Sequence, residues 1–215
     1  MGLPFYYLAY CAAQAVTYND PMITGVVLAA GGSTRMGTHK LLLPLGGEPI
    51  VTRTVRQVSE AGVDDVLVVL GYEHEKILGA LEGLRCRHAI NPDYDTGMGS
   101  SFRTAVAKLG DSEAAMFALA DQPFVTAGDY RRLLTAYREQ GPGIVSVRYG
   151  EVTAPPHLFD REFFPELAAL EHGARPVLQG HRDRTVILQF PAELLMDIDT
   201  PEDYERARER VSSGR

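Results

Sequence analysis

Tryptophan is absent from this sequence of 215 residues and cysteine is scarce, with Cys11 and Cys86 as the only two. Two cysteines provide neither a disulfide framework nor a cluster of thiolate metal ligands. The six histidines are scattered, and no pair of them has the spacing of metal ligands on an evident helix face. No apolar run approaches the ~20 residues that a membrane-spanning helix needs. These absences argue against a disulfide scaffold and a membrane protein, and they predict a cytoplasmic protein.

Positive charge is also in short supply. Lys and Arg number 21 against 28 Asp and Glu, which gives a formal net charge of −7 at pH 7. This balance argues against a nucleic-acid partner. An acidic protein that binds an acidic ligand, such as a nucleotide, needs local cations and a metal ion at the binding site. The expected partners are therefore small molecules.

The length suits one full-sized domain, and no linker, composition shift or repeat divides the chain. Residues 1–21 are apolar and aromatic, without the positive n-region or the cleavage site of a secretory signal. They are expected to be an extension of doubtful order preceding a start at Met22, or an amphipathic arm that covers an apolar patch. The domain itself is expected over residues 22–215.

Short aliphatic runs alternate with segments of helical periodicity. Strands are expected over residues 23–28, 66–70, 87–90, 115–120, 144–147, 186–190 and 195–198. Helices are expected over residues 49–61, 73–84, 101–109, 127–140, 161–170, 174–181 and from 200 onward. The alternation predicts an α/β fold: a single-domain, Rossmann-like three-layer sandwich whose mostly parallel sheet has helices on both faces. Residues 149–160 are expected to form a loop or a hairpin edge, because Pro155 and Pro156 argue against a central strand.

A glycine-rich loop with two cations follows the first expected strand. It reads Ala29-Ala30-Gly31-Gly32-Ser33-Thr34-Arg35-Met36-Gly37-Thr38-His39-Lys40. Glycines let backbone N–H groups approach a ligand, and successive N–H groups form a concave anion site. Arg35 and Lys40 add positive charge, so the loop predicts a polyphosphate ligand. It is neither a Walker A loop nor a Gly-x-Gly-x-x-Gly turn. The alternative is a glycine-rich turn with solvated charges.

Further polar groups follow other strands of the expected sheet. Ligands of such sheets bind beyond the carboxyl ends of the strands, which brings the Gly31 loop, Gly71, Asn91 and Asp121 around one mouth. The carboxylate of Asp121 suits Mg²⁺, although an Asp before Gln-Pro is also ordinary turn chemistry. Asp197 and Asp199 flank Ile198 at strand spacing and should project to the same side. Either carboxylate can complete a metal site or simply stabilise the following helix start.

The segment Asn91-Pro92-Asp93-Tyr94-Asp95-Thr96-Gly97-Met98-Gly99-Ser100-Ser101 is too long and glycine-rich for a simple hairpin. Its glycines and hydroxyls precede a helix, where they are able to hold a base, a ribose or a phosphate. For Ser100 the alternative is a helix N-cap, and Arg103 is either a third cation or a surface residue.

These motifs together resemble a known family. Leu-Ala-Ala-Gly-Gly-Ser-Thr-Arg-Met-Gly-x-x-Lys-Leu-Leu-Leu-Pro from Leu28, Leu-Ala-Asp-Gln-Pro at Asp121 and Asp-Ile-Asp-Thr-Pro-Glu-Asp from Asp197 resemble the MobA-like nucleotidyltransferases. The resemblance is strongest to the molybdenum-cofactor cytidylyltransferases. It implies the fold of nucleotide-diphospho-sugar transferases, Mg²⁺ as cofactor, and transfer of CMP from CTP to molybdopterin with release of diphosphate. A molybdoenzyme or its maturation chaperone is a further implied partner.

The resemblance also assigns roles to residues. Arg35, Lys40 and Asp121 are the implied catalytic residues, and Asp121 with Asp199 the implied metal ligands. The implied nucleotide-binding residues are Leu28, Ala29, Ala30, Gly31, Gly32, Ser33, Arg35, Lys40, Gly71, Asn91, Gly97, Met98, Gly99, Ser100 and Ser101.

The chain departs from the family on the acceptor side. Related sequences tend to have Gly-His-Pro where this chain reads Ala154-Pro155-Pro156-His157, and a longer polar turn where it has Glu171-His172-Gly173. These departures concern the acceptor and leave the nucleotide side of the resemblance untouched. The alternatives are a guanylyl-, sugar-phosphate or methylerythritol-phosphate transferase on the same fold, a non-catalytic cofactor carrier or insertion chaperone, and an NAD(P)-dependent oxidoreductase on the same domain.

Overall fold

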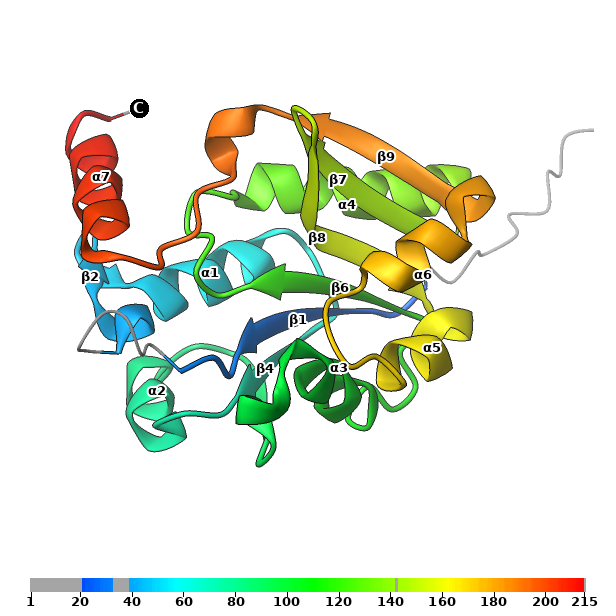
Figure 1. Ribbon diagram of the computed structural model, residues 1–215, viewed down its shortest axis with the longest axis horizontal. Coiled ribbons are helices and arrows are strands. Elements are labelled where there is room, and N and C mark those ends of the chain that lie inside the picture. Colours follow the sequence, from blue (N-terminus) through cyan, green and yellow to red (C-terminus); the bar gives the residue numbers. More distant parts are fainter. Residues whose placement is uncertain (1–20, 33–38, 142, 215) are drawn as a thin grey trace, which may run out of the picture.

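Strand β1 (Ile23–Ala29) is buried along its whole length, as expected of an aliphatic run that is covered on both faces. It pairs in parallel with β4 (Asp65–Leu70) on one side and with β6 (Ala114–Leu119) on the other. Strand β5 (Arg87–Ile90) continues the parallel part beyond β4. The computed structural model describes residues 21–32, 39–141 and 143–214, which are coloured along the chain in Figure 1.

The other half of this seven-stranded sheet contains its one antiparallel strand. Strand β8 (Val152–Asp160) runs antiparallel to both β6 and β7 (Ile144–Tyr149), and β9 (Thr185–Phe190) pairs in parallel with β7. The order of the seven strands is β5-β4-β1-β6-β8-β7-β9. β2 (Pro44–Leu45) and β3 (Glu48–Pro49) form a separate two-stranded sheet. The predicted mostly parallel α/β fold is confirmed.

Helices cover both faces of the sheet (Figure 1). Buried side chains of α1 (Ile50–Glu60), α2 (His74–Ala80), α4 (Ala127–Gln140) and α7 (Pro201–Ser212) belong to one apolar cluster. Those of α3 (Met98–Val106), α5 (Phe164–Ala168) and α6 (Arg175–Gly180) belong to another, on the opposite face. No helix of the described chain is long and apolar enough to span a membrane.

The stretch that contains Pro155 and Pro156 is inside the sheet, so the expectation of a loop or hairpin edge is wrong. The prolines fit because they lie where the ladder is interrupted. Pairing between β8 and β6 ends at His157, and the register between β8 and β7 shifts between Val145 and Val147. Neither proline is therefore required to donate to a regular ladder, which is the reason that proline is normally excluded.

The ends of several other elements differ from expectation. Residues 195–198 form no strand: a 3₁₀ turn (Ala192–Leu194) leads into an extended segment whose Ile198 N–H donates to the Asp121 carbonyl at 3.2 Å. Helix α3 begins at Met98, before the expected 101. The helix expected over 161–170 is a 3₁₀ turn (Arg161–Phe163) followed by the short α5. Further 3₁₀ turns are Lys40–Leu42, Tyr94–Thr96 and Arg182–Arg184.

Candidate nucleotidyltransferase site

Three charged residues that are far apart in the sequence meet beyond the ends of β1 and β6. The Lys40 Nζ lies 2.6 Å from Asp121 Oδ2 and 2.7 Å from Asp199 Oδ1. Lys40 follows the glycine-rich loop, Asp121 follows β6, and Asp199 precedes α7. The backbone bond from Ile198 to Asp121 holds the two acidic segments side by side. The structure thus brings together three of the residues that the sequence singled out.

The carboxylates control the protonation of Lys40. Burial lowers the pKa of the Lys40 ammonium, but the charges and hydrogen bonds of Asp121 and Asp199 outweigh this effect and raise it above its ordinary value. Lys40 is therefore a permanent cation at neutral pH. Its side chain is 12% exposed, whereas that of Asp199 is 52% exposed. The site opens to solvent on the Asp199 side.

Asp197 and Asp199 have different partners. Asp197 Oδ1 accepts a hydrogen bond of 2.8 Å from Gln122 Nε2, whereas Asp199 contacts Lys40. Burial, with the nearby charges of Asp121 and Asp199, raises the pKa of Asp197, and the bond from Gln122 offsets part of this effect. The arrangement favours Asp199 as the second metal ligand and gives Asp197 the role of holding Gln122.

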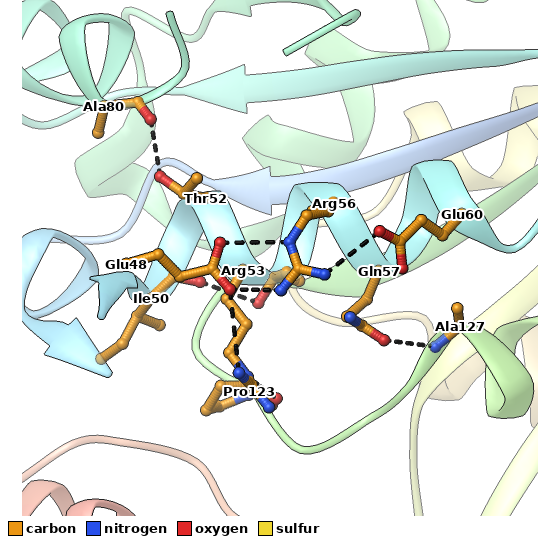
Figure 2. Close-up of polar contacts among 11 residues, drawn as sticks. Glu48, Ile50, Thr52, Arg53, Arg56, Gln57, Glu60, Ala80, Pro123 and Ala127 are labelled. Carbon is orange, nitrogen blue, oxygen red and sulfur yellow. Dashed lines mark hydrogen bonds and ion pairs between the residues drawn. The ribbon is translucent and has the colours of Figure 1, made fainter. Parts of the chain in front are cut away.

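Helix α1 fixes the turn that carries Asp121. Thr54 Oγ1 donates to the Ala120 carbonyl at 3.0 Å, and Arg53 Nε donates to the Pro123 carbonyl at 3.1 Å. Figure 2 shows Arg53 reaching Pro123 from the helix. Neither Arg53 nor Thr54 belongs to a sequence motif that predicts a functional role. The available signal was Thr54 itself, a polar residue on the face of α1 that also buries Val51, Val55 and Val58.

The same helix is tied to both of its neighbouring helices (Figure 2). Thr52 Oγ1 donates to the Ala80 carbonyl of α2 at 2.7 Å, and Gln57 Oε1 accepts from the Ala127 N–H of α4 at 2.8 Å. Arg56 pairs with Glu48 and, at 3.2 Å, with Glu60. These contacts make α1 a rigid support for the Asp121 turn.

Residues 91–101 contain a network of hydrogen bonds among their own polar side chains. Asn91 Nδ2 donates to Ser100 Oγ at 2.8 Å and to Ser101 Oγ at 3.1 Å, while Asn91 Oδ1 accepts from the Asp93 N–H at 3.0 Å. All three side chains of Asn91, Ser100 and Ser101 are buried. They shape the loop from within, and direct nucleotide contact by them stays a prediction.

The glycines of this region permit close approaches between chain segments. A Cβ at residue 99 would lie 2.0 Å from the Leu170 carbonyl oxygen, and Gly97 has a φ of +121°. A Cβ at residue 71 would lie 2.6 Å from the Ala30 carbonyl oxygen. Gly71 therefore lets the end of β4 pack against the end of β1, where the Tyr72 N–H donates to that carbonyl at 3.2 Å.

The start of the loop is only partly described. Leu28, Ala29 and Ala30 are buried, and Gly31 and Gly32 are exposed at the end of β1. Arg35 and Ser33 lie outside the described residues, as do residues 1–20, so the expectations for them stay predictions. The Lys40 end of the loop is described and points to the two carboxylates.

A cavity of about 180 Å³ lies beside this site, on the α3 side of the sheet. Leu28 of β1 and Leu119 of β6 contribute to its lining, and the chain continues from these strand ends to Gly31 and to Asp121. The exposed side chain of Met98 and the buried ring of His157 also line it. A ligand group in this cavity is therefore next to the strand ends that form the charged site.

The donor set is suited to Mg²⁺ only in partnership with a nucleotide. The described residues contain no group of three or more His, Cys, Asp or Glu side chains placed to hold a metal ion. Asp121 and Asp199 nevertheless present oxygens within hydrogen-bond reach of one nitrogen, close enough to share a cation. Mg²⁺ is typically bound by one or two carboxylates, with phosphates and water at its other positions. The two carboxylates fit that pattern.

An α/β sheet with a cation and two carboxylates beyond its strand ends defines a protein of the nucleotidyltransferase type. Residues 25–186 match the family described as the MobA-like NTP transferase domain, and the chain belongs to this family. It is 32% identical to the purine catabolism protein PucB of Bacillus subtilis, over 90% of this chain and 99% of PucB. It is 31% identical to nicotine blue oxidoreductase of Paenarthrobacter nicotinovorans, over 71% of this chain and 78% of that protein.

A more distant match concerns part of a longer protein. The bifunctional protein GlmU of Symbiobacterium thermophilum is 35% identical over 54% of this chain, but only 25% of GlmU is covered.

Solved structures agree with the family. Rv0371c of Mycobacterium tuberculosis superposes with a TM-score of 0.79 at 29% identity, over 88% of this chain and 99% of Rv0371c. A nucleotidyl transferase from Methanothermobacter has the same TM-score at 26% identity, over 90% of this chain and 99% of that one. A manganese complex of Rv0371c superposes with a TM-score of 0.73 at 28% identity, over 87% of this chain and 98% of that one.

Proposed function

We propose that the protein is a Mg²⁺-dependent nucleotidyltransferase that moves CMP from CTP to a phosphorylated acceptor of the molybdopterin type and releases diphosphate. The observation that carries this proposal is the contact of Lys40 with both Asp121 and Asp199, beyond the strand that feeds the glycine-rich loop. Cations and carboxylates in one place are what a triphosphate and its metal ion require.

Lys40 and the two carboxylates have complementary roles in this proposal. Asp121 and Asp199 hold Mg²⁺, which when bound neutralises charge on the α-phosphate and the departing diphosphate. Lys40, released from the carboxylates, pairs with the β- and γ-phosphates together with Arg35 and the N–H groups of Gly31 and Gly32. The remaining assigned residues, Leu28 to Ala30, Ser33, Gly71, Asn91 and 97–101, lie on the nucleoside side of the site, where Leu28 and Met98 also border the neighbouring cavity.

The acceptor phosphate is already a competent nucleophile, so the reaction needs no general base. One acceptor oxygen attacks the α-phosphorus, and the bond from that phosphorus to the diphosphate oxygen breaks. Catalysis then rests on in-line positioning and on charge stabilisation. The fixed turn at Asp121, bonded to Thr54 and Arg53, supplies the positioning.

Two of the relatives suggest functions other than cytidylyl transfer to molybdopterin. The similarity to part of GlmU keeps a sugar-phosphate acceptor as an alternative. The similarity to nicotine blue oxidoreductase over 78% of that protein favours a second candidate function, NAD(P)H-dependent reduction of a dye-like substrate. If the protein is the CTP-dependent nucleotidyltransferase, it works in the cytoplasm and delivers its product to a molybdoenzyme or its maturation chaperone.

The proposal is tested by incubating the purified protein with Mg²⁺, each of the four NTPs and a panel of phosphorylated acceptors. Diphosphate release with CTP and molybdopterin is the expected result. The Asp121→Asn variant should lose this release, while Lys76→Met, which changes an exposed ion pair with Glu73, should keep it. NADPH oxidation with a dye, in the absence of any diphosphate release, would establish the oxidoreductase instead.

A further inference from the structure

The cavity beside the charged site has apolar walls over most of its surface. Most of its lining comes from Leu28, Met98, Phe102, Phe117, Leu119 and Pro155. A dry cavity of ~150 Å³ is enough to hold benzene, so a volume of about 180 Å³ accommodates a small planar ring system. A hexose carries hydroxyl groups around its whole ring, and apolar walls leave most of these without partners. The cavity is therefore suited to an aromatic heterocycle.

The polar groups of the cavity gather on the β8 and α6 side. They are His157 and Thr153 of β8 and Arg175 at the start of α6. A ligand in this cavity therefore meets hydrogen-bonding groups along one edge and apolar side chains elsewhere.

His157 is the most deeply placed of these polar groups. The residue is 5% exposed and lies on β8 next to Leu158 and Phe159, which are fully buried. Its Nδ1 lies 3.0 Å from Ser146 Oγ on β7, and its ring packs edge-on against Phe159 with centroids 6.1 Å apart. Ser146 and Phe159 thus fix the plane of the imidazole. Because Nδ1 contacts Ser146, a hydrogen bond from this ring to a ligand would use Nε2.

His157 is uncharged at neutral pH, which suits a hydrogen bond to the uncharged edge of a ligand's ring. Burial lowers the pKa of His157 to about 4, partly offset by a hydrogen bond to the Pro156 backbone. A neutral imidazole offers a directional hydrogen bond without the cost of a buried charge.

We propose that His157, oriented by Ser146, selects the acceptor by a hydrogen bond to the edge of a planar heterocycle that fills this cavity. Arg175 at the rim meets the negative charge of the same ligand. This inference rests on the proposed function, because it names the acceptor subsite of that reaction. His157 is the specificity-determining residue and Ser146 is the residue that positions it. Nucleotide binding at Lys40 is independent of both.

The absence of tryptophan gives a direct assay. The intrinsic fluorescence of a pterin, here 6-hydroxymethylpterin phosphate, is followed as the protein is titrated in, with glucose 1-phosphate as competitor. CTP binding in the presence of Mg²⁺ is measured separately by calorimetry. His157→Leu removes the hydrogen-bonding ring, His157→Gln restores a polar group, and His88→Leu on the exposed part of β5 is the matched control.

We expect the wild-type protein to bind the pterin and to prefer it to glucose 1-phosphate. His157→Leu should weaken pterin binding about 10-fold, the effect of one buried hydrogen bond, while His157→Gln stays within about 3-fold of wild type. His88→Leu should leave pterin binding unchanged, and all three variants should bind CTP normally. Equal pterin affinity of wild type and His157→Leu would overturn the inference, as would tighter binding of glucose 1-phosphate than of the pterin.

The two proposals fail in different ways. Normal CTP binding with a pterin affinity insensitive to residue 157 would refute the acceptor subsite and leave the nucleotidyltransferase intact. A wild-type protein that binds the pterin through His157 but does not bind CTP would refute the nucleotidyltransferase and support the subsite. If His157→Leu does not fold by circular dichroism, Ser146→Ala and Ser146→Thr replace it. Ser146→Ala should weaken pterin binding severalfold and Ser146→Thr should not; equal binding would overturn the inference.

Discussion

Replacing Lys40 by Met should tighten the binding of a free divalent ion while it slows turnover. In the structure the Lys40 ammonium contacts one oxygen of each of the two proposed metal ligands, Asp121 and Asp199. A metal ion that binds without nucleotide must therefore displace Lys40 from both. The Lys40→Met variant removes this competitor and leaves two uncompensated carboxylates close together.

The size of the effect follows from the exposure of the two ion pairs. The Asp199 side chain is 52% exposed and that of Asp121 is 22% exposed, so screening keeps each pair near the range of surface ion pairs, about 0–1 kcal/mol. Together they correspond to a gain of up to about 2 kcal/mol in metal binding, or up to roughly 30-fold in Kd. Nucleotide turnover should fall on the order of 10²-fold or more, because charge at the transition state is lost.

Electron paramagnetic resonance of Mn²⁺ measures the binding directly in the absence of nucleotide. Lys40→Arg keeps the positive charge and should bind Mn²⁺ about as weakly as wild type. Lys76→Met removes a lysine from an exposed pair with Glu73 and should have no effect. If Lys40→Met binds Mn²⁺ no more tightly than wild type does, Asp121 and Asp199 are not the metal ligands and this reasoning is refuted.

Three further predictions concern stability and positioning. Thr54→Val should lower the free energy of unfolding, measured in urea, by about 1–2 kcal/mol, because the Ala120 carbonyl next to Asp121 loses its hydrogen bond. The variant should also change kcat more than KM, and an unchanged kcat would contradict the positioning role. Gly99→Ala should lower the free energy of unfolding by about 2–3 kcal/mol, because the new Cβ would meet the Leu170 carbonyl. Gly79→Ala is the control, since a Cβ at residue 79 enters open space and should cost no stability. Equal melting temperatures of the two variants would refute this prediction. Burial lowers the pKa of His157 from 6.5 to about 4, so between these pH values the imidazole binds a proton only in the unfolded chain. The free energy of unfolding should therefore fall by up to about 3 kcal/mol as the pH drops from 6.5 to about 4. His157→Asn should show a shallower fall in urea titrations at stepwise pH, and an identical slope would contradict the assignment.

The position of the charged site could be predicted from the order and direction of the strands. The strands before Gly31 and Asp121 are continuous aliphatic runs, and parallel strands place their carboxyl ends at one edge of a sheet. This rule brings the Gly31 loop and Asp121 to one edge, and the loop motif with its family resemblance adds Lys40. Asp199 was selected through the family resemblance as a metal ligand, and its contact with Lys40 is seen only in the folded chain.

The acceptor side was not predictable from local pattern. Pro155 and Pro156 argue against a central strand, and only the register shift between β8 and β7 shows how they are tolerated there. The bonds from Ser146 to His157 and from Thr54 to Ala120 join segments whose sequences contain no matching signal. Such side-chain partners depend on the final packing of strands and helices. They become visible only in the folded chain.

The central claim is that Lys40, Asp121 and Asp199 form a site for a metal-bound triphosphate that donates its nucleotidyl group. The most direct measurement follows the label of α-³²P-CTP in a single turnover with Mg²⁺ and molybdopterin. We expect wild-type protein to transfer the label to the acceptor, with one diphosphate released per label, and Asp121→Asn and Lys40→Met to do so on the order of 10²-fold more slowly. Label transfer by both variants at the wild-type rate would contradict the central claim.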